Sequence, residues 1–163
     1  MATTLISSIA VLLLSAGAVP AVHHPKLKEG LWTVHTQSSN AVGKPSIGEY
    51  TICRDQAFDD HSESLANAMK GCTKVRETFD GHRYVSEVRC SVGKTVIDSK
   101  AEVTFHGDTE THSESSSTFT PPMDGMSTMT MTMDQKYLGS CPAGVKPGDR
   151  TSADGTVTHL GKH

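Results

Sequence analysis

The segment from Gly125 to Cys141, G-M-S-T-M-T-M-T-M-D-Q-K-Y-L-G-S-C, constrains the fold more than any other part of the chain. One set of alternate positions holds Met129, Met131, Met133, Gln135 and Tyr137; the other holds Thr128, Thr130, Thr132, Asp134 and Lys136. Successive side chains of a strand point to opposite faces, so this period of two predicts a half-buried β-strand. We expect it to close a sheet, with the methionine face inward and Cys141 fixing its end covalently.

Further strands are predicted in hairpin order, at residues 30–36, 48–52, 73–79, 82–90, 94–105 and 109–119. Asp80-Gly81 is a strong hairpin signal because both residues readily take the positive φ angles of a two-residue turn. Residues 109–119 contain many Ser and Thr but almost no apolar face, so we expect an edge strand or one that lines a wet interior. The pattern predicts a mainly β fold, an antiparallel meander of about seven strands that curls into an open or closed barrel.

One short helix is predicted near the N-terminal side, after the second strand. Asp55 is a suitable N-cap, and apolar residues follow at helical spacing up to a stop at Gly71. In the two strands before it, Trp32 and Val34 share one face, as do Tyr50 and Ile52. Only 5% of the residues are aromatic, so we expect a modest core built mostly from aliphatic side chains and Met.

Four cysteines, Cys53, Cys72, Cys90 and Cys141, are too widely spaced for a metal or redox motif. In an oxidising compartment they are expected to form two disulfides, for which three pairings exist. The pairing that we prefer joins Cys53 to Cys72 around the helix and Cys90 to Cys141 between the middle of the sheet and its last strand.

The N-terminal residues 1–21 have the pattern of a secretory signal peptide: no charged side chain, an apolar centre and small residues at the end. Cleavage after Ala18 or Ala21 is compatible with the pattern, and we favour Ala21. The expected organisation is then a flexible N-terminus at 22–29, a β-meander domain at 30–141 and a disordered tail at 142–163. No stable membrane anchor is expected after cleavage.

Several motifs occur together in one order: G-L-W-T-V, an I-C before the helix, G-C-T-K, F-D-G-H-R-Y, and the M-T-M-T-M-D-Q-K-Y-L-G-S-C strand. In this order they resemble the domain of unknown function 3617 family of small exported bacterial proteins, over residues 28–141. The resemblance implies a periplasmic or envelope setting in a Gram-negative bacterium and implies no particular chemistry. The chain departs from the family pattern in its long tail and in the Ser- and Thr-rich residues 109–118.

Metal binding has two weak candidates. The thioether groups of Met123, Met126 and their neighbours suit Cu(I), although alternate Met residues are more simply explained as an adaptable core face. His159 and His163 would share a face of a helix and could bind Zn, but the glycines around them disfavour a helix. We therefore expect no cofactor.

Enzyme activity is not indicated, because no nucleophile-elbow, zinc-protease or phosphate-loop motif occurs. The net charge of −3, with no run of Lys or Arg, gives no reason to expect nucleic acid as a partner. We expect a non-enzymatic periplasmic protein that binds a small hydrophobic ligand or an envelope partner. The candidate ligand-binding residues are Trp32, Tyr50, Met129, Met131, Met133 and Tyr137. A structural or stress-protective envelope protein without a ligand and a Cu- or Zn-binding protein are the alternatives, and the oligomeric state stays open.

Overall fold

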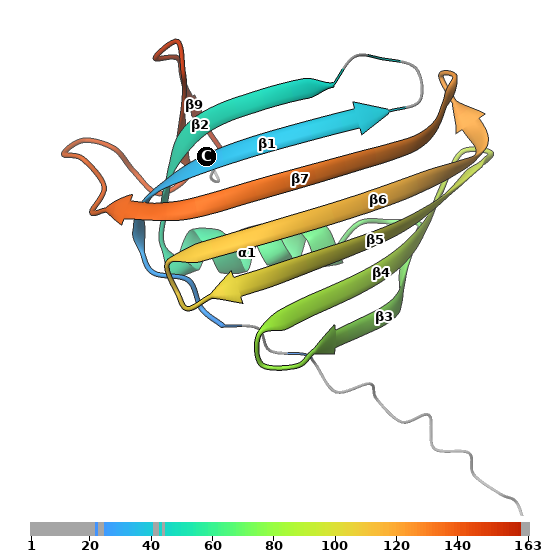
Figure 1. Cartoon of the computed structure of the whole chain (residues 1–163), viewed down its shortest axis with the longest axis horizontal. Coiled ribbons are helices and arrows are strands. Elements are labelled where there is room, and N and C mark those ends of the chain that lie inside the picture. The colour runs from blue at the N-terminus through green and yellow to red at the C-terminus, as the bar shows by residue number, and fades with distance from the viewer. Residues whose placement is uncertain (1–21, 23–24, 41–42, 44, 161–163) are drawn as a thin grey trace, which may run out of the picture.

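The computed structural model describes residue 22, residues 25–40, residue 43 and residues 45–160, so the predicted signal peptide lies outside the described residues. The described chain forms one helix and one sheet of nine strands, each antiparallel to its neighbours (Figure 1). The strands are β1 (Gly30–Asn40), β2 (Ser46–Arg54), β3 (Cys72–Phe79), β4 (Arg83–Val92), β5 (Thr95–His106), β6 (Glu110–Met123), β7 (Met126–Gly139), β8 (Asp149–Ser152) and β9 (Val157–His159), and the helix is α1 (Gln56–Asn67).

The order of the strands explains where the helix lies. The sheet runs β3-β4-β5-β6-β7-β1-β2-β8-β9, so β2 and β3 are far apart in the sheet although they are neighbours in sequence. The connection between them must therefore cross the sheet, and α1 makes the crossing on the inner side of the curve (Figure 1). The predicted antiparallel meander is confirmed in its open form, with nine strands rather than about seven.

The face of the sheet that turns toward α1, the concave face, carries the predicted methionine stripe of β7. In the antiparallel register, Met129, Met131 and Met133 lie opposite Ser117, Ser115 and Ser113 of β6. Directly opposed residues share a face, so Met and Ser alternate across the concave face. The methionines are half-buried, in agreement with the predicted inward side of β7.

β6 lies between β5 and β7, so the prediction of an edge strand for this segment is wrong. The second alternative, a strand that lines the interior with polar groups, is the one that fits. A polar strand is tolerated here because several of its hydroxyl groups have partners: Ser113 donates to the Met133 carbonyl at 3.2 Å, and the Ser99 and Ser117 hydroxyl oxygens are 2.8 Å apart.

The hydrophobic core is small and lies where β1 and β2 meet α1. Trp32, Val34 and Ile52 are buried at its centre, and partly buried side chains pack against them: Leu27, Tyr50, Phe58, Met133 and Tyr137. The Trp32 indole is fully buried, and its Nε1 donates to the Lys28 carbonyl at 2.9 Å. Leu27 and Lys28 belong to the segment that the sequence predicts to be flexible, and these contacts connect that segment to the core.

All four cysteines are in disulfides, but the preferred pairing is wrong: Cys53 pairs with Cys141, and Cys72 pairs with Cys90. Cys72 and Cys90 are opposite each other in the β3–β4 ladder, with Cα atoms 3.9 Å apart. Cys53 is the next-to-last residue of β2 and pairs with Leu31 of β1. Leu31 also pairs with Gly139 at the end of β7, so Cys141 follows close to Cys53. The predicted pairing assumed that a disulfide encloses the helix, whereas α1 carries the chain across the sheet and separates Cys53 from Cys72.

The structure also differs from the predicted disordered tail, because residues 149–160 contain β8 and β9. β2 would otherwise present an unpaired edge, and β8 pairs with it from Tyr50 to Ile52. The Arg150 guanidinium lies 4.0 Å from the Tyr50 ring centroid, and the Gly148 amide donates to the Cys53 carbonyl at 2.9 Å. Backbone pairing and one stacked cation thus order a segment that has no apolar periodicity.

Candidate ligand-binding pocket

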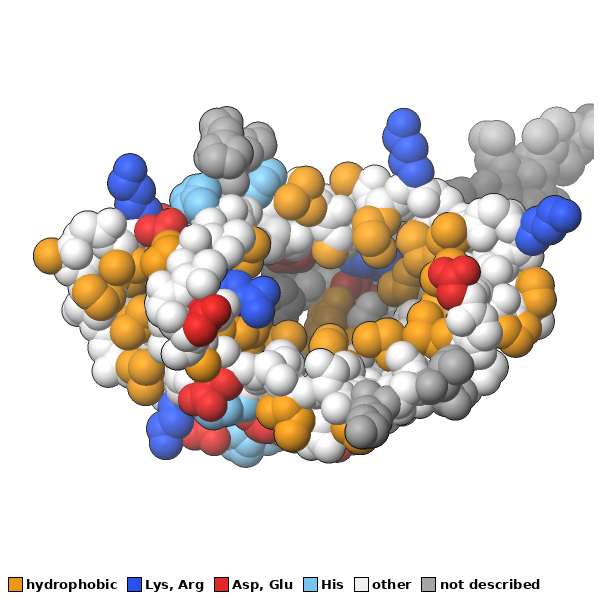
Figure 2. Space-filling view, turned by 90° about the horizontal axis from the view of Figure 1, so that it is seen from above, with side chains coloured by type: hydrophobic (Ala, Val, Ile, Leu, Met, Phe, Trp, Pro, Cys, Tyr) orange, Lys and Arg blue, Asp and Glu red, His pale blue; other side chains and the backbone are white. Residues whose placement is uncertain are grey.

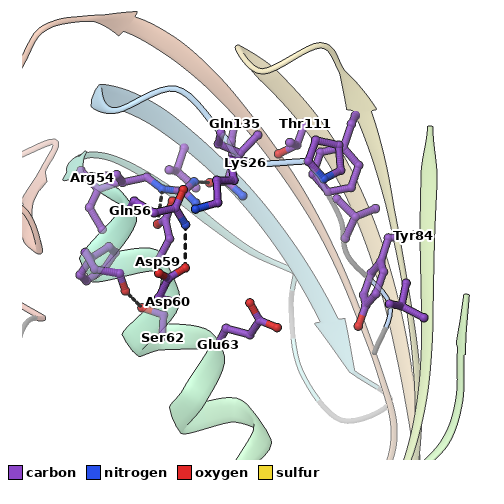
Figure 3. Close-up of a pocket in the computed structure, with 18 of the residues that line it drawn as sticks. Lys26, Arg54, Gln56, Asp59, Asp60, Ser62, Glu63, Tyr84, Thr111 and Gln135 are labelled. Carbon is purple, nitrogen blue, oxygen red and sulfur yellow. Dashed lines mark hydrogen bonds and ion pairs between the residues drawn. The ribbon is translucent and has the colours of Figure 1, made fainter. Parts of the chain in front are cut away.

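A pocket of about 440 Å³ lies between α1 and the concave face of the sheet (Figure 3). Figure 2 shows the surface of the molecule hollowed where the curved sheet opens. The pocket has a wall from the sheet, a wall from the helix and a border from the N-terminal segment. Its lining residues are Val22, Pro25, Lys26, Leu27, Val34, Tyr50, Ile52, Arg54, Gln56, Phe58, Asp59, Asp60, Ser62, Glu63, Tyr84, Val103, Phe105, Thr111 and Gln135.

The sheet wall follows from the strand register. Gln135 of β7 lies opposite Val34 of β1 on one side and Thr111 of β6 on the other, and Thr111 lies opposite Phe105 of β5. Four strands therefore place four side chains in one row on the concave face. Val103, two residues before Phe105, adds a second apolar contact. The wall is mostly apolar, with a hydroxyl and an amide at its centre.

The helix wall is polar and acidic. Phe58, Asp59, Ser62 and Glu63 repeat at the spacing of one helical face, and all four line the pocket. α1 begins as the sequence predicts, because the Asp55 side chain accepts a hydrogen bond of 2.7 Å from the Phe58 amide. None of its residues is buried, so α1 covers the pocket without packing tightly on the sheet.

Arg54 connects the two walls. Its Nη1 donates to Gln135 Oε1 at 2.8 Å, and its Nε donates to Asp59 Oδ1 at 2.9 Å. The side chains of Arg54 and Asp59 are only 15% and 20% exposed, so this ion pair is well shielded from water. Burial raises the pKa of Asp59 above its usual value, although the Arg54 guanidinium acts in the opposite direction. The guanidinium also lies 5.3 Å from the Trp32 ring, which extends the link into the core.

Thr111 is the unusual residue of the sheet wall. It is only 2% exposed, and its Oγ1 has no hydrogen-bond partner among the described residues. Figure 3 shows Thr111 on the sheet side of the pocket, away from the labelled residues of α1. A buried hydroxyl without a partner is unfavourable in an empty pocket, because the group loses its hydrogen bonds to water. A molecule in the pocket could supply the missing partner.

The far side of the pocket ends at Tyr84 of β4. Its hydroxyl donates to the Glu77 carboxylate, which also accepts from Lys74 Nζ at 2.8 Å. Burial, and then the hydrogen bond to Glu77, raises the pKa of Tyr84 to about 12. The phenol is therefore uncharged at neutral pH and adds an aromatic surface to the pocket rather than a charge.

Only some of the predicted ligand-binding residues line the pocket. Tyr50 lines the pocket, whereas Trp32, Met133 and Tyr137 pack in or against the core beneath it. Met129 and Met131 share the concave face but lie outside the pocket lining, farther along β7. Alternation identified the correct face of β7 but could not show how much of that face α1 covers.

The metal candidates are not brought together among the described residues. Met123 and Met126 face each other at the β6–β7 turn, and His159 Nδ1 lies 2.7 Å from Asp149 Oδ1. His163 lies outside the described residues. The part of the chain that the structure describes contains no cluster of three or more His, Cys, Asp or Glu with metal-site geometry.

Sequence reasoning missed Arg54, Thr111 and the acidic face of the helix. The sequence could have indicated that Arg54 points inward, because it follows the inward-facing Ile52 by two residues. It also precedes the acidic start of the helix, where a partner for its charge is available. Thr111 carried no such signal, because it is one hydroxyl residue among many in a Ser- and Thr-rich strand. Its neighbours in the sheet, Phe105 of β5 and Gln135 of β7, come from other parts of the sequence.

The fold and the pocket define a class of protein: an open antiparallel sheet whose concave face is crossed by a single helix over an amphipathic cavity. The chain belongs to the family described as protein of unknown function (DUF3617), whose model matches residues 27–141. This match confirms the resemblance seen in the sequence motifs. No curated protein matches the chain significantly. Among the described residues, no helix is both long and apolar enough to cross a membrane.

Proposed function

We propose that this protein is a non-enzymatic binding protein that holds a small amphipathic molecule between α1 and the concave face of the sheet. The observation that carries the proposal is the pocket itself, an apolar wall from four strands with a buried hydroxyl that lacks a partner. Ligand sites are commonly concave and mostly apolar, with a few polar groups that orient the ligand. The loose packing of α1 supports the proposal, because a helix that is not buried can move to admit a ligand.

We infer that the protein acts in an oxidising compartment, which for an exported bacterial protein is the periplasm. Two disulfides among four cysteines and the signal-like residues 1–21 support this inference. Fractionation of cells and N-terminal sequencing test it, with a mature chain expected to begin at Val22. Recovery of the unprocessed chain from the cytoplasm would contradict it.

Native mass spectrometry of the protein purified after export tests for a ligand, with calorimetry to follow binding. The decisive variant is Val103→Trp, which fills the pocket from the sheet wall. Thr104→Trp is the matched control, because residue 104 is the next residue of β5 and its side chain faces the opposite side of the sheet. We expect bound mass in the wild type and the control and its loss in Val103→Trp. Bare mature mass in all three, with no binding in calorimetry, would favour a structural envelope protein instead.

A further inference from the structure

We propose that the ligand of this pocket carries an uncharged polar group, such as a hydroxyl, ester or amide, which forms a hydrogen bond with Thr111. The inference rests on the proposed function and makes it more specific, because it selects neutral amphiphiles over fatty acids and long-chain amines. It depends on two features of the pocket: the unpartnered Thr111 hydroxyl and the distribution of charge around it.

The row that surrounds Thr111 contains no ionisable side chain. Its members are Val34, Phe105, Thr111 and Gln135, from four adjacent strands. The hydroxyl can donate or accept one hydrogen bond, so it suits an alcohol, a carbonyl or an amide equally well. An ionised group placed beside it would lose its hydration without an opposite charge on this wall, which is costly.

The charged lining residues do not provide that opposite charge. Arg54 is the cation nearest to this row in the register, and both Asp59 and Gln135 already engage it. Lys26 is an exposed side chain of the N-terminal segment, where water and salt weaken its effect. Asp60 and Glu63 lie on the helix wall and would repel a carboxylate in the pocket.

A cationic head group could instead remain near those carboxylates at the helix wall. It would then leave Thr111 without a partner, and its affinity would not depend on the hydroxyl. The contribution of Thr111 therefore separates the two binding modes: a neutral group that reaches the sheet wall depends on Oγ1, and a charged group that stays outside does not.

The test is calorimetric titration of the purified protein with four molecules of equal chain length: decanol, methyl decanoate, decanoate and decylamine, all below the concentrations at which they aggregate. Each is titrated into wild type, Thr111→Val and Thr111→Ser. Valine has nearly the shape of threonine but lacks the hydroxyl, and serine retains the hydroxyl. Thr104→Val, on the opposite face of β5, controls for a general effect of replacing threonine in the sheet.

We expect decanol and methyl decanoate to bind most tightly and to lose about fivefold in affinity in Thr111→Val, the value of one hydrogen bond. Thr111→Ser should restore most of that loss, and Thr104→Val should have no effect. Tighter binding of decanoate or decylamine, or affinity for decanol that does not change in Thr111→Val, overturns the inference while leaving the proposed function intact. Failure of all four molecules to bind the wild type overturns both.

Discussion

Arg54 and Gln135, which lie on β2 and β7 with β1 between them, are joined by a hydrogen bond of 2.8 Å from Nη1 to Oε1. The same guanidinium holds Asp59 at the start of α1. One side chain thus connects both strands that flank β1 to the helix that crosses the sheet. Because Phe58 also packs on the core, the N-terminal end of α1 is attached to the sheet, and its other end is not buried.

Replacing Arg54 with Met should lower the free energy of unfolding by about 3 kcal/mol at neutral pH, because Asp59 would be left shielded without its cation. The pKa of Asp59 is already raised by burial, and it should rise further without Arg54. For a carboxyl whose folded pKa is raised, stability falls as the pH rises through that pKa. The loss should therefore be smaller near pH 4 than at neutral pH, as urea unfolding at both values can show.

Arg89→Met is the control for the arginine substitution. Arg89 pairs with Asp98 at 2.6 Å on the surface, and the two side chains are 63% and 48% exposed. A pair exposed to this degree usually contributes little to stability, because water and salt screen it. Losses of equal size in the two variants, or a loss in Arg54→Met that does not change with pH, would show that Arg54 does not neutralise Asp59.

The two disulfides should contribute unequally to stability. The separations are 88 residues for Cys53–Cys141 and 18 for Cys72–Cys90. In the loop-entropy model these lengths correspond to about 4.5 and about 3 kcal/mol, respectively. Urea unfolding of the double Ser variants tests the order. Peptide mapping without reduction tests the pairing itself, and a peptide that links Cys53 to Cys72 would contradict the structure.

Thr111→Val should stabilise the ligand-free protein by about 1 kcal/mol, because it removes a buried hydroxyl that has no partner. Thr111→Ser should not, because it keeps the hydroxyl and loses a buried methyl group. Both variants are compared with the wild type by urea unfolding after any ligand has been removed. A valine variant that is less stable than the serine variant would mean that the hydroxyl has a partner in the free protein.

His112 should titrate above its usual pKa, chiefly because its Nδ1 lies 2.6 Å from the Asp134 carboxylate and secondarily because of Glu114. The charged imidazole stabilises the folded state below pH 6.5, and this contribution is lost as the pH rises through the folded pKa. In Asp134→Asn the pKa should fall toward the usual value. Titration by NMR measures it, with Asp98→Asn as a surface control that leaves His112 unchanged.

Gly30 and Gly139 test how closely the backbones pack where β1 begins and β7 ends. Both have strongly positive φ angles, 140° and 145°. A Cβ on Gly30 would lie 2.3 Å from the Gly139 carbonyl oxygen, whereas a Cβ on Gly139 would meet nothing within 4 Å. Gly30→Ala should therefore cost roughly 2 kcal/mol more than Gly139→Ala, since the φ strain is similar and only the first adds a clash. Thermal or urea unfolding of both variants measures the difference.

Local chemistry in the sequence was sufficient for several features of the structure. The alternation in residues 128–137 predicted β7 and its inward face, and Asp55 predicted the start of α1. Asp80-Gly81 predicted the position of the β3–β4 turn, in which Gly81 but not Asp80 takes a positive φ. Each depends on interactions within a few residues, such as a cap, a turn angle or the side-chain period of a strand. The sequence motifs also identified the family, which the match over residues 27–141 confirms.

Tertiary structure alone decided the features that join distant segments. The pairing of Cys53 with Cys141, the central place of β6 and the addition of β8 to the edge of β2 depend on which strands lie side by side. The pocket has the same origin, because Thr111 lines it together with residues of β5, β7 and α1 that are distant in sequence. The physical reason is that strand order is set by the free energy of the whole sheet, which short-range patterns do not encode.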